Sequence, residues 1–232
     1  MSLEPHRSVG QAIGHRVQDS RNPSASENTV QLIGLLDSPY VRRTAISLHL
    51  LGIAFEHKPL SVFRDFDALR AINPLVKAPT LVCDDGTQLV DSALIIDYAE
   101  TLAGRRLTPA APEAHRRALR WIGVALVVCE KAVQVYYEHK RKPERQDPDW
   151  IARVSGQLQS ACALLEQELR GTGEQEWLFG EALTQADVTL AVAWGFARLV
   201  AADVVPENDY PKLAAFAARA ERTPEFLAYP MD

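Results

Sequence analysis

The stretch from Asn73 to Val82 contains the feature that most limits how this chain can fold, a proline placed directly before a β-branched apolar run. Pro79 has no N–H group, so it cannot sit inside a central strand and must enter one from a loop. Such a position suits a cis bond between Ala78 and Pro79, which would leave the N–H and C=O groups of Ala78 unpaired in the fold. Those two groups are then able to pair, in the manner of a strand, with an extended peptide.

A second polar corner, Asp91 followed by Ser92, stands directly before an apolar run with helical spacing. A helix that begins there presents unpaired N–H groups, which bind a carboxylate, and the Asp91 side chain can meet an ammonium group. Taken alone, a loop proline and an ordinary helix cap explain both motifs at least as well. The functional interpretation therefore depends on elements upstream.

The residues around these motifs predict a small domain with the order β-α-β-α-β-β-α. A nearly continuous apolar run, Val30 to Leu36, is typical of a buried strand, and Ser38 followed by Pro39 is a preferred helix start. The helix that follows is expected to end at Gly52. The other expected elements are a strand over 53–60, a helix over 66–72, strands over 80–83 and 88–90, and a helix over 92–102.

From residue 108 onward the sequence loses its strand pattern. Thr184, three residues before Asp187, is a capping-box-like start, and the helix that follows it is apolar all round, as expected of a buried helix. The expected helices cover 113–142, 149–170, 188–201 and 210–222, with a short turn at 223–226. We therefore expect an α/β domain over 29–107, a proline-rich linker over 108–112 and an all-helical domain over 113–232.

The remaining composition limits the partners and the location. Residues 1–28 lack any hydrophobic period, which predicts a disordered or loosely packed arm. The 25 basic and 30 acidic residues give a net charge of −5, so no basic field indicates nucleic acid. The three widely spaced cysteines lack metal-ligand spacing, which indicates free thiols in a reducing compartment and no metal site. No apolar run reaches about 18 residues, so we expect no membrane span and a cytoplasmic location.

In this order and spacing, the Ser38-Pro39 pair, the proline at 79 and the Asp91-Ser92 corner resemble the glutathione S-transferase family. The resemblance runs from about Val30 to the end of the chain, and it is to bacterial-like cytosolic members that use a serine. It implies a thioredoxin-like α/β domain followed by an all-α domain, with glutathione as the co-substrate. It also implies a role in detoxification and assembly into a homodimer.

The resemblance also assigns roles to individual residues. Ser38 would be the catalytic residue, because its hydroxyl and the helix start could together lower the pKa of the glutathione thiol by about one to three units. The residues implied for glutathione binding are Lys77, Ala78, Pro79, Asp91 and Ser92. The candidates for lining a pocket for a small hydrophobic electrophile are Tyr40, Trp121, Val124, Val128 and Tyr136. Arg42 and Arg43 lie one turn into the helix, where they could support the anion, but solvated surface charges are the stronger expectation for them.

Departures from the family pattern keep alternatives open. Many relatives read Asn-Pro-x-Gly-Lys-Val-Pro, whereas this chain has Val76 in place of the Gly and Ala78 in place of the Val. A glycine permits φ > 0, which valine resists, so a different loop path is expected. This different path puts the contact of Lys77 with a glutathione carboxylate in question.

One alternative function is therefore a non-catalytic binding or regulatory protein with the same fold. The other is a glutathione-dependent dehalogenase or isomerase, although the Ser-Ser-x-Ser signature of isomerase-type relatives is missing. A serine at 38 instead of a cysteine argues against thiol transfer.

Overall fold

A four-stranded sheet forms the first part of the computed structural model, which describes residues 30–172 and 176–231. The strands are β1 (Val30–Ile33), β2 (Phe55–Lys58), β3 (Thr80–Val82) and β4 (Gln88–Val90), and their order in the sheet is β2-β1-β3-β4. β1 pairs in parallel with β2 and antiparallel with β3, while β4 pairs antiparallel with β3. The predicted arm over residues 1–28 lies outside the described residues.

Three helices complete the α/β part, and their ends follow local sequence signals. They are α1 (Pro39–Leu51), α2 (Phe66–Ile72) and α3 (Ser92–Ala103). α1 is the crossover that two parallel strands require, and it ends at Gly52, whose φ of 76° is the left-handed conformation that glycine adopts freely. The predicted order β-α-β-α-β-β-α is therefore confirmed.

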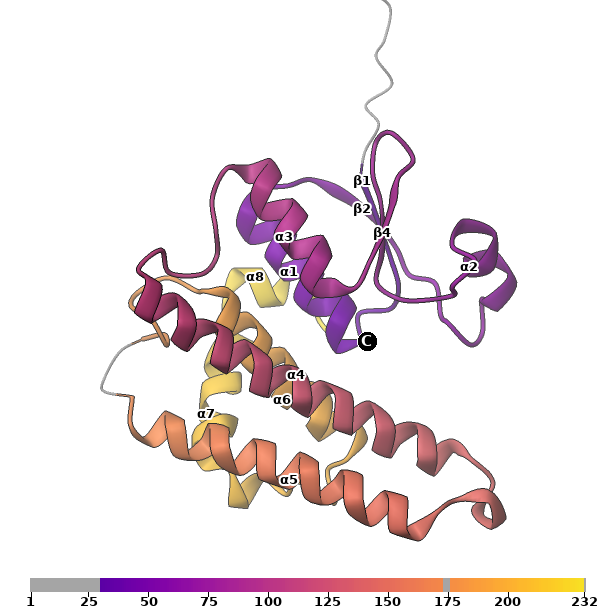
Figure 1. Cartoon of the computed structure of the whole chain (residues 1–232), viewed down its shortest axis with the longest axis vertical. Helices are drawn as coiled ribbons and strands as arrows, with labels where there is room; N and C mark the ends of the chain where they lie inside the picture. The colour runs from indigo at the N-terminus through magenta and orange to yellow at the C-terminus, as the bar shows by residue number, and fades with distance from the viewer. Residues whose placement is uncertain (1–29, 173–175, 232) are drawn as a thin grey trace, which may run out of the picture.

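The second part is entirely helical within the described residues. Its helices are α4 (Pro112–Lys140), α5 (Pro148–Arg170), α6 (Gln185–Val200), α7 (Pro211–Ala220) and α8 (Pro224–Leu227), with short 3₁₀ turns at Pro143–Arg145 and Glu207–Asp209. Figure 1 shows the sheet with α1 and α3 on one side of the molecule, the helices α4 to α7 on the other, and α8 beside α1. The fold is thus a thioredoxin-like domain followed by an all-helical domain, as the sequence predicts.

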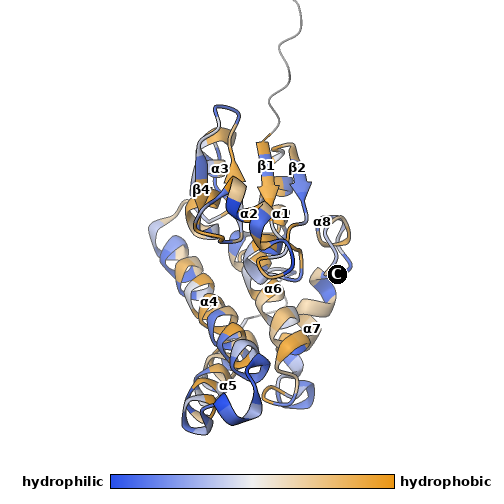
Figure 2. Ribbon diagram, turned by 90° about the vertical axis from the view of Figure 1, so that its right-hand side faces the viewer, coloured by the Kyte–Doolittle hydropathy of each residue, from blue (hydrophilic) through white to orange (hydrophobic). Residues whose placement is uncertain are grey.

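Helix α6 is the centre of the helical part. Figure 2 shows hydrophobic colours along β1 and α6, and hydrophilic colours where α4 leads into α5. The predicted capping box is present at its start, because the Thr184 side chain accepts from the Asp187 N–H and the Asp187 carboxylate accepts from the Thr184 N–H at 2.8 Å. The same carboxylate also accepts from the Leu178 N–H at 2.8 Å. α6 packs against α4, α7 and also α1, so it joins the two parts of the molecule. This contact holds the start of α1 in a fixed place relative to α4.

Candidate active site

Ser38 is the residue immediately before α1, and its side chain is half-buried. Its Oγ accepts a long hydrogen bond of 3.5 Å from the Val41 N–H, and its backbone carbonyl accepts a bond of 2.9 Å from the Arg42 N–H. Within the described residues the hydroxyl donates to no acceptor. Ser38 therefore places a free hydroxyl donor at the positive end of a helix dipole.

The loop before β3 carries the Ala78–Pro79 peptide bond, which is cis, as the sequence predicts. Neither the N–H nor the C=O of Ala78 has a hydrogen-bond partner among the described residues. Gly34, which follows β1, holds this loop against α1, because a Cβ atom added to Gly34 would meet both Val41 and Ala78. The side chains of Val41 and Ala78 therefore both approach the space beside the Gly34 Cα atom.

Val76 corrects an expectation from the sequence. It adopts a φ of 49°, the left-handed conformation that a β-branched residue rarely takes. The loop therefore keeps a positive φ at this position although the residue is a valine. The cause is a pair of residues that sequence reasoning missed. The Val76 N–H donates to the Asn73 carbonyl at 2.9 Å, and the buried Asn73 amide donates to Thr80 Oγ1 at 2.8 Å. Thr80 in turn donates to the Lys77 carbonyl at 2.6 Å, while the Lys77 side chain is exposed.

Asp91 and Ser92 form the start of α3, as predicted. Asp91 has a φ of 73° and a ψ of 121°, an unusual conformation for a residue other than glycine, and its Oδ1 accepts a hydrogen bond of 2.9 Å from the Ala93 N–H. Asp91 is exposed, whereas Ser92 is buried. The first N–H groups of α3 and the Ser92 hydroxyl together make a place suited to an anion.

Arg42 and Arg43 are not solvated surface charges, and this prediction was wrong. Each is 1% exposed. Arg42 forms a two-pronged ion pair with Glu221, with both nitrogen-to-oxygen distances at 2.6 Å, and it also donates to the Tyr229 carbonyl at 2.8 Å. Arg43 donates from Nη1 to Ser92 Oγ at 2.8 Å, so it connects α1 to the start of α3. Both partners are distant in sequence, and local patterns gave no sign of them.

An aromatic pair that the sequence analysis missed joins the two parts of the molecule near Ser38. The Phe63 and Tyr137 rings contact edge to face with centroids 5.5 Å apart, and their side chains are 67% and 46% exposed. Burial raises the pKa of the Tyr137 hydroxyl, and the charges of Tyr136 and of Asp37, the neighbour of Ser38, add to the increase. Tyr137 therefore lies within electrostatic range of the Ser38 corner.

The five predicted pocket residues differ in how far they are buried. Tyr40 is half-buried against the helical core, and burial raises the pKa of its hydroxyl well above the usual value. Tyr136 is half-buried and its ring lies 5.8 Å from that of Tyr137. Trp121 is buried in the helical core.

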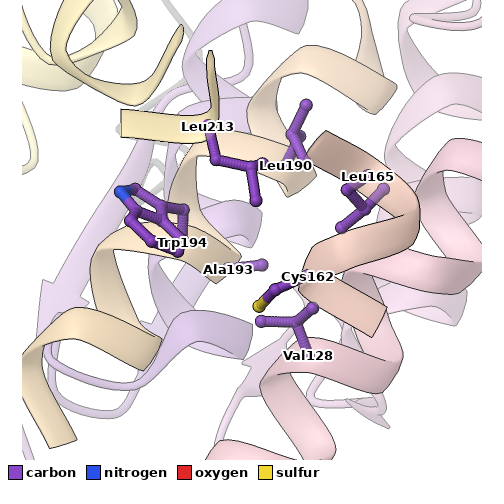
Figure 3. A pocket seen from close by; sticks show the side chains of 7 residues that line it. All are labelled: Val128, Cys162, Leu165, Leu190, Ala193, Trp194 and Leu213. Atoms are coloured by element: carbon purple, nitrogen blue, oxygen red, sulfur yellow. The ribbon is translucent and has the colours of Figure 1, made fainter. Parts of the chain in front are cut away.

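Val128 and Val124 lie in two further places. Val128 lines an enclosed space among α4, α5, α6 and α7, drawn in Figure 3, which has no room for a water molecule. Val124 lines a groove of about 570 Å³ between α4 and α5. Trp121 and Val128 are thus packed in the helical core, with Val124 against it, and the pocket role of the five residues stays a prediction.

The described residues contain no group of three or more His, Cys, Asp and Glu side chains arranged to hold a metal ion. Among the same residues, none of the helices is long and apolar enough to cross a membrane. Cys83, Cys129 and Cys162 are all buried free thiols, in agreement with the sequence analysis.

Two family models match this chain, one on each side of the linker. Residues 32–107 match the model of the glutathione S-transferase N-terminal domain, and residues 148–219 match that of the glutathione S-transferase C-terminal domain. The first range contains Ser38, Ala78 and Asp91. The candidate site therefore lies within the N-terminal model.

Three individual proteins show the extent of the similarity. Maleylacetoacetate isomerase of Pseudomonas aeruginosa is 32% identical over 161 residues, which are 64% of this chain and 72% of that protein. A glutathione transferase family member of Pseudomonas fluorescens Pf-5, solved with bound glutathione, is 29% identical with a TM-score of 0.73, covering 88% of this chain and 100% of that one. A glutathione S-transferase of Methylobacterium radiotolerans, solved with glutathione sulfonate, is 24% identical with a TM-score of 0.78, covering 86% and 93% of the two chains.

Proposed function

Because the chain belongs to the glutathione S-transferase family, we propose that it binds glutathione at the start of α1 and joins the glutathione sulfur to a small hydrophobic electrophile. The observation that supports this most directly is the Ser38 hydroxyl, a half-buried donor with no acceptor among the described residues. It stands at a helix N-terminus, and Ala78, whose backbone groups are unpaired, approaches Gly34 together with Val41 of the same helix. A tripeptide thiol fits this combination, because it offers a backbone to pair and a sulfur to stabilise.

In the proposed reaction Ser38 donates a hydrogen bond to the glutathione sulfur. A free cysteine thiol titrates near 8.5, so only a few per cent is ionised at pH 7. A hydrogen bond to a charged group contributes about 1.5–3 kcal/mol and a helix N-terminus about 0.3–1 kcal/mol, which together lower the thiol pKa by about one to three units. The thiol proton leaves to solvent. With an aryl halide, the thiolate lone pair then forms the carbon–sulfur bond and the halide departs with its electron pair.

The other glutathione contacts follow from the same placement. Ala78, held by the Pro79 peptide bond, pairs through its N–H and C=O with the cysteinyl unit. Asp91 receives the ammonium group of the γ-glutamyl unit, and Ser92 receives its carboxylate. The exposed Lys77 ammonium meets the carboxylate at the other end of the tripeptide. We assign the electrophile to the surface beside the contacting rings of Phe63 and Tyr137, with Tyr40 of α1 and Tyr136 of α4 as further contacts.

Three variants of Ser38 test the proposal. Ser38→Ala is expected to lower kcat/KM for an aryl halide by about 100-fold, and to move the pKa seen in its pH profile upward by about one to three units. Ser38→Gly separates catalysis from helix capping, because glycine caps a helix almost as well as serine but has no hydroxyl. Ser38→Thr keeps a hydroxyl and should retain most activity. Unchanged turnover in the alanine and glycine variants would reject Ser38 as the activating residue.

A second candidate activity is favoured by one comparison. The Pseudomonas aeruginosa relative at 32% identity is a maleylacetoacetate isomerase, and an isomerase would share the glutathione site and differ in its second substrate. Direct assay of maleylacetoacetate beside an aryl halide, each with glutathione, separates the two activities. A protein that gives no heat with millimolar glutathione in calorimetry would instead support the non-catalytic binding or regulatory alternative and contradict both activities, whereas clear saturable binding would count against that alternative.

We also propose that the chain forms a homodimer. Apolar side chains are exposed on α3, α4 and α5, namely Leu94 at 66%, Leu119 at 52%, Val127 at 38% and Leu164 at 44%. Val127 and Leu164 also line the groove between α4 and α5. Light scattering should give twice the chain mass of 25.7 kDa, and Leu164→Asp should shift the protein toward the monomer. A monomer in the unaltered protein would contradict the proposal.

A further inference from the structure

Residues 221–231, which we call the C-terminal segment, return from the helical part to elements of the α/β part. Figure 1 shows α8, which belongs to this segment, beside α1. The Tyr229 ring stacks on the Phe55 ring of β2 with centroids 5.7 Å apart, and it meets the His49 ring of α1 edge to face at 5.6 Å. The Phe226 side chain is completely buried. The C-terminal segment is therefore packed against the α/β part.

Arg42 on α1 is the residue that the C-terminal segment encloses. Its side chain is 1% exposed. Nη1 and Nη2 each donate to the Glu221 carboxylate at 2.6 Å, and Nε donates to the Tyr229 carbonyl at 2.8 Å. The guanidinium carbon also lies 5.3 Å from the centroid of the Phe226 ring. A guanidinium bound through all three of its nitrogens has a fixed orientation, so α1 is tied to the C-terminal segment at this residue.

Ser38 depends on the same residue through the backbone. Its carbonyl accepts from the Arg42 N–H at 2.9 Å, which is the first hydrogen bond within α1. The two other hydrogen bonds of Ser38 among the described residues are longer, at 3.2 Å from its N–H to the Leu35 carbonyl and 3.5 Å from the Val41 N–H to its Oγ. The last of these is at the limit of hydrogen-bond distance. A movement of Arg42 should therefore move Ser38 and its hydroxyl.

The other parts of the proposed glutathione site are held by different contacts. Among the described residues, no hydrogen bond joins the C-terminal segment to the loop before β3 or to the start of α3. The loop is held instead by the bond of 2.8 Å from the Asn73 amide to Thr80 Oγ1. Loss of the Arg42 contacts should therefore disturb Ser38 and leave the backbone that binds glutathione in place.

We propose that the C-terminal segment acts through Arg42 to position the Ser38 hydroxyl for the glutathione sulfur. This inference rests on the proposed function, since it takes Ser38 as the activating residue. Arg42 is a positioning residue, because its guanidinium is enclosed by the C-terminal segment and does not contact the sulfur. When its bonds to the segment are lost, the hydroxyl points at the sulfur for less of the time. The pKa of the bound thiol then rises, while the Kd for glutathione changes little.

Arg42→Met tests the proposal in the full chain, because methionine keeps an unbranched side chain but has no guanidinium. The pKa of bound glutathione, read from the ultraviolet absorbance of its thiolate, should rise by about 0.5–1 unit. Below that pKa the thiolate fraction falls about 3- to 10-fold, and kcat/KM for an aryl halide should fall by the same factor. The Kd for glutathione in calorimetry should stay within about 2-fold of the unaltered value. Arg42→Lys keeps a cation beside Glu221 and should recover part of the loss.

Glu221→Gln weakens the same contact from the side of the C-terminal segment and should also raise the thiol pKa. Glu166→Gln is the matched control. The buried Glu166 carboxylate accepts from the Lys212 and Leu213 N–H groups at the start of α7, each at 2.9 Å, and none of its hydrogen bonds among the described residues reaches α1. This variant should also lose stability in urea, yet it should leave the thiol pKa unchanged.

Two results would overturn the role of Arg42. One is an unchanged thiol pKa in folded Arg42→Met, and Glu221→Gln carries the comparison if thermal unfolding shows that Arg42→Met does not fold. The other is an equal rise in Glu166→Gln, which would mean that any loss of stability has this effect. If Ser38→Ala itself leaves the thiol pKa unchanged, the proposed role of Ser38 and this inference fall together. If Ser38→Ala raises the thiol pKa and the variants of the Arg42 contact do not, only the inference falls.

Discussion

The backbone of Gly34 lies so close to Ala78 that a Cβ atom on Gly34 would come within 3.0 Å of the Ala78 Cβ. The same atom would lie 2.5 Å from Cγ2 of Val41, and Gly34 has a φ of 137°, which L side chains rarely adopt. Only glycine fits between the start of α1 and the loop that carries Pro79. The distance between the Ser38 hydroxyl and the Ala78 backbone is therefore set in part by a residue that touches no ligand.

Gly34→Ala is accordingly expected to push the loop away from α1. The overlap and the unfavourable φ together should lower the free energy of unfolding by about 2–5 kcal/mol, and glutathione affinity should fall with it. Adding Val41→Ala should recover part of the loss, since it removes the closest contact. Gly123→Ala is the matched control, because a Cβ there meets nothing within 4 Å, and it should stabilise α4 by about 0.5–1 kcal/mol. Urea unfolding measures the free energy of unfolding of each variant. Equal stability of Gly34→Ala and Gly123→Ala would contradict the packing argument.

Val76→Gly should stabilise the protein, in contrast to most glycine substitutions. Valine at a φ of 49° is strained by about 1–2 kcal/mol, which exceeds the cost of about 0.5–1 kcal/mol for the added freedom of glycine in the unfolded chain. Leu75→Gly is the control, since the neighbouring Leu75 is exposed and does not have a positive φ. It should destabilise the protein. If denaturant unfolding shows both variants losing stability alike, Val76 carries no strain.

The ion pair between Arg42 and Glu221 should stabilise the packing of the C-terminal segment on α1. Glu221→Gln leaves the buried Arg42 charge with a weaker partner, so the free energy of unfolding should fall by about 1–3 kcal/mol, after allowance for the 36% exposure of Glu221. Glu207→Gln, at an exposed position with no ion pair among the described residues, should change it by less than 0.5 kcal/mol, on the order of ordinary surface substitutions. Thermal and urea unfolding compare the stability of the two variants. Equal stability of Glu221→Gln and Glu207→Gln would show that the ion pair of Arg42 with Glu221 contributes little to the free energy of unfolding.

Alkaline conditions should destabilise the fold through two buried thiols. Burial raises the pKa of Cys129 and of Cys162 to about 12, whereas an unfolded thiol ionises near 8.5. Between these values the unfolded chain loses a proton that the folded chain keeps, so stability falls as pH rises, by about 1.4 kcal/mol per unit for each thiol. Below the unfolded pKa both states are protonated and the contribution is fully retained.

The thiol prediction is checked by unfolding the protein in urea between pH 8 and pH 10.5 under reducing conditions. The double variant Cys129→Ala, Cys162→Ala should show a shallower decline over this range, even if its stability at pH 8 is lower. Burial is the largest cause of the raised pKa values of Tyr40 and Tyr210, and this contribution is the same in both proteins, so it cancels in the comparison. Parallel declines would mean that the thiols ionise as easily in the folded state as in the unfolded state.

Tyr137 should affect the electrophile and not glutathione. Tyr137→Ala removes the ring that contacts Phe63 at the proposed electrophile surface, so KM for an aryl halide should rise several-fold while the Kd for glutathione stays within 2-fold. Leu102→Ala is the control, because it truncates an exposed apolar side chain near the end of α3, outside the proposed sites. Steady-state kinetics with varied halide distinguish the two, and equal effects would exclude Tyr137 from the electrophile surface.

Much of the fold was predictable from local rules. Ser38 and Pro39 start a helix, Gly52 ends it, and Thr184 with Asp187 caps α6, because each of these signals depends on residues only a few positions apart. The candidate site was predictable in part for the same reason. The corner at Asp91 and the loop at Pro79 are backbone features encoded by adjacent residues.

The sequence by itself therefore determined the order of the elements, their ends and the motifs at the start of α1 and α3. Only the tertiary structure decided how the arginines beside Ser38 are used, because the partners of Arg42 and Arg43 are 179 and 49 residues away. The conformation of Val76 is a different case, because hydrogen bonds of Asn73 and Thr80 within the same loop outweigh the preference of a β-branched residue. Local propensities are worth less than about 1 kcal/mol per residue, so contacts between distant segments override them wherever packing or a buried charge is involved.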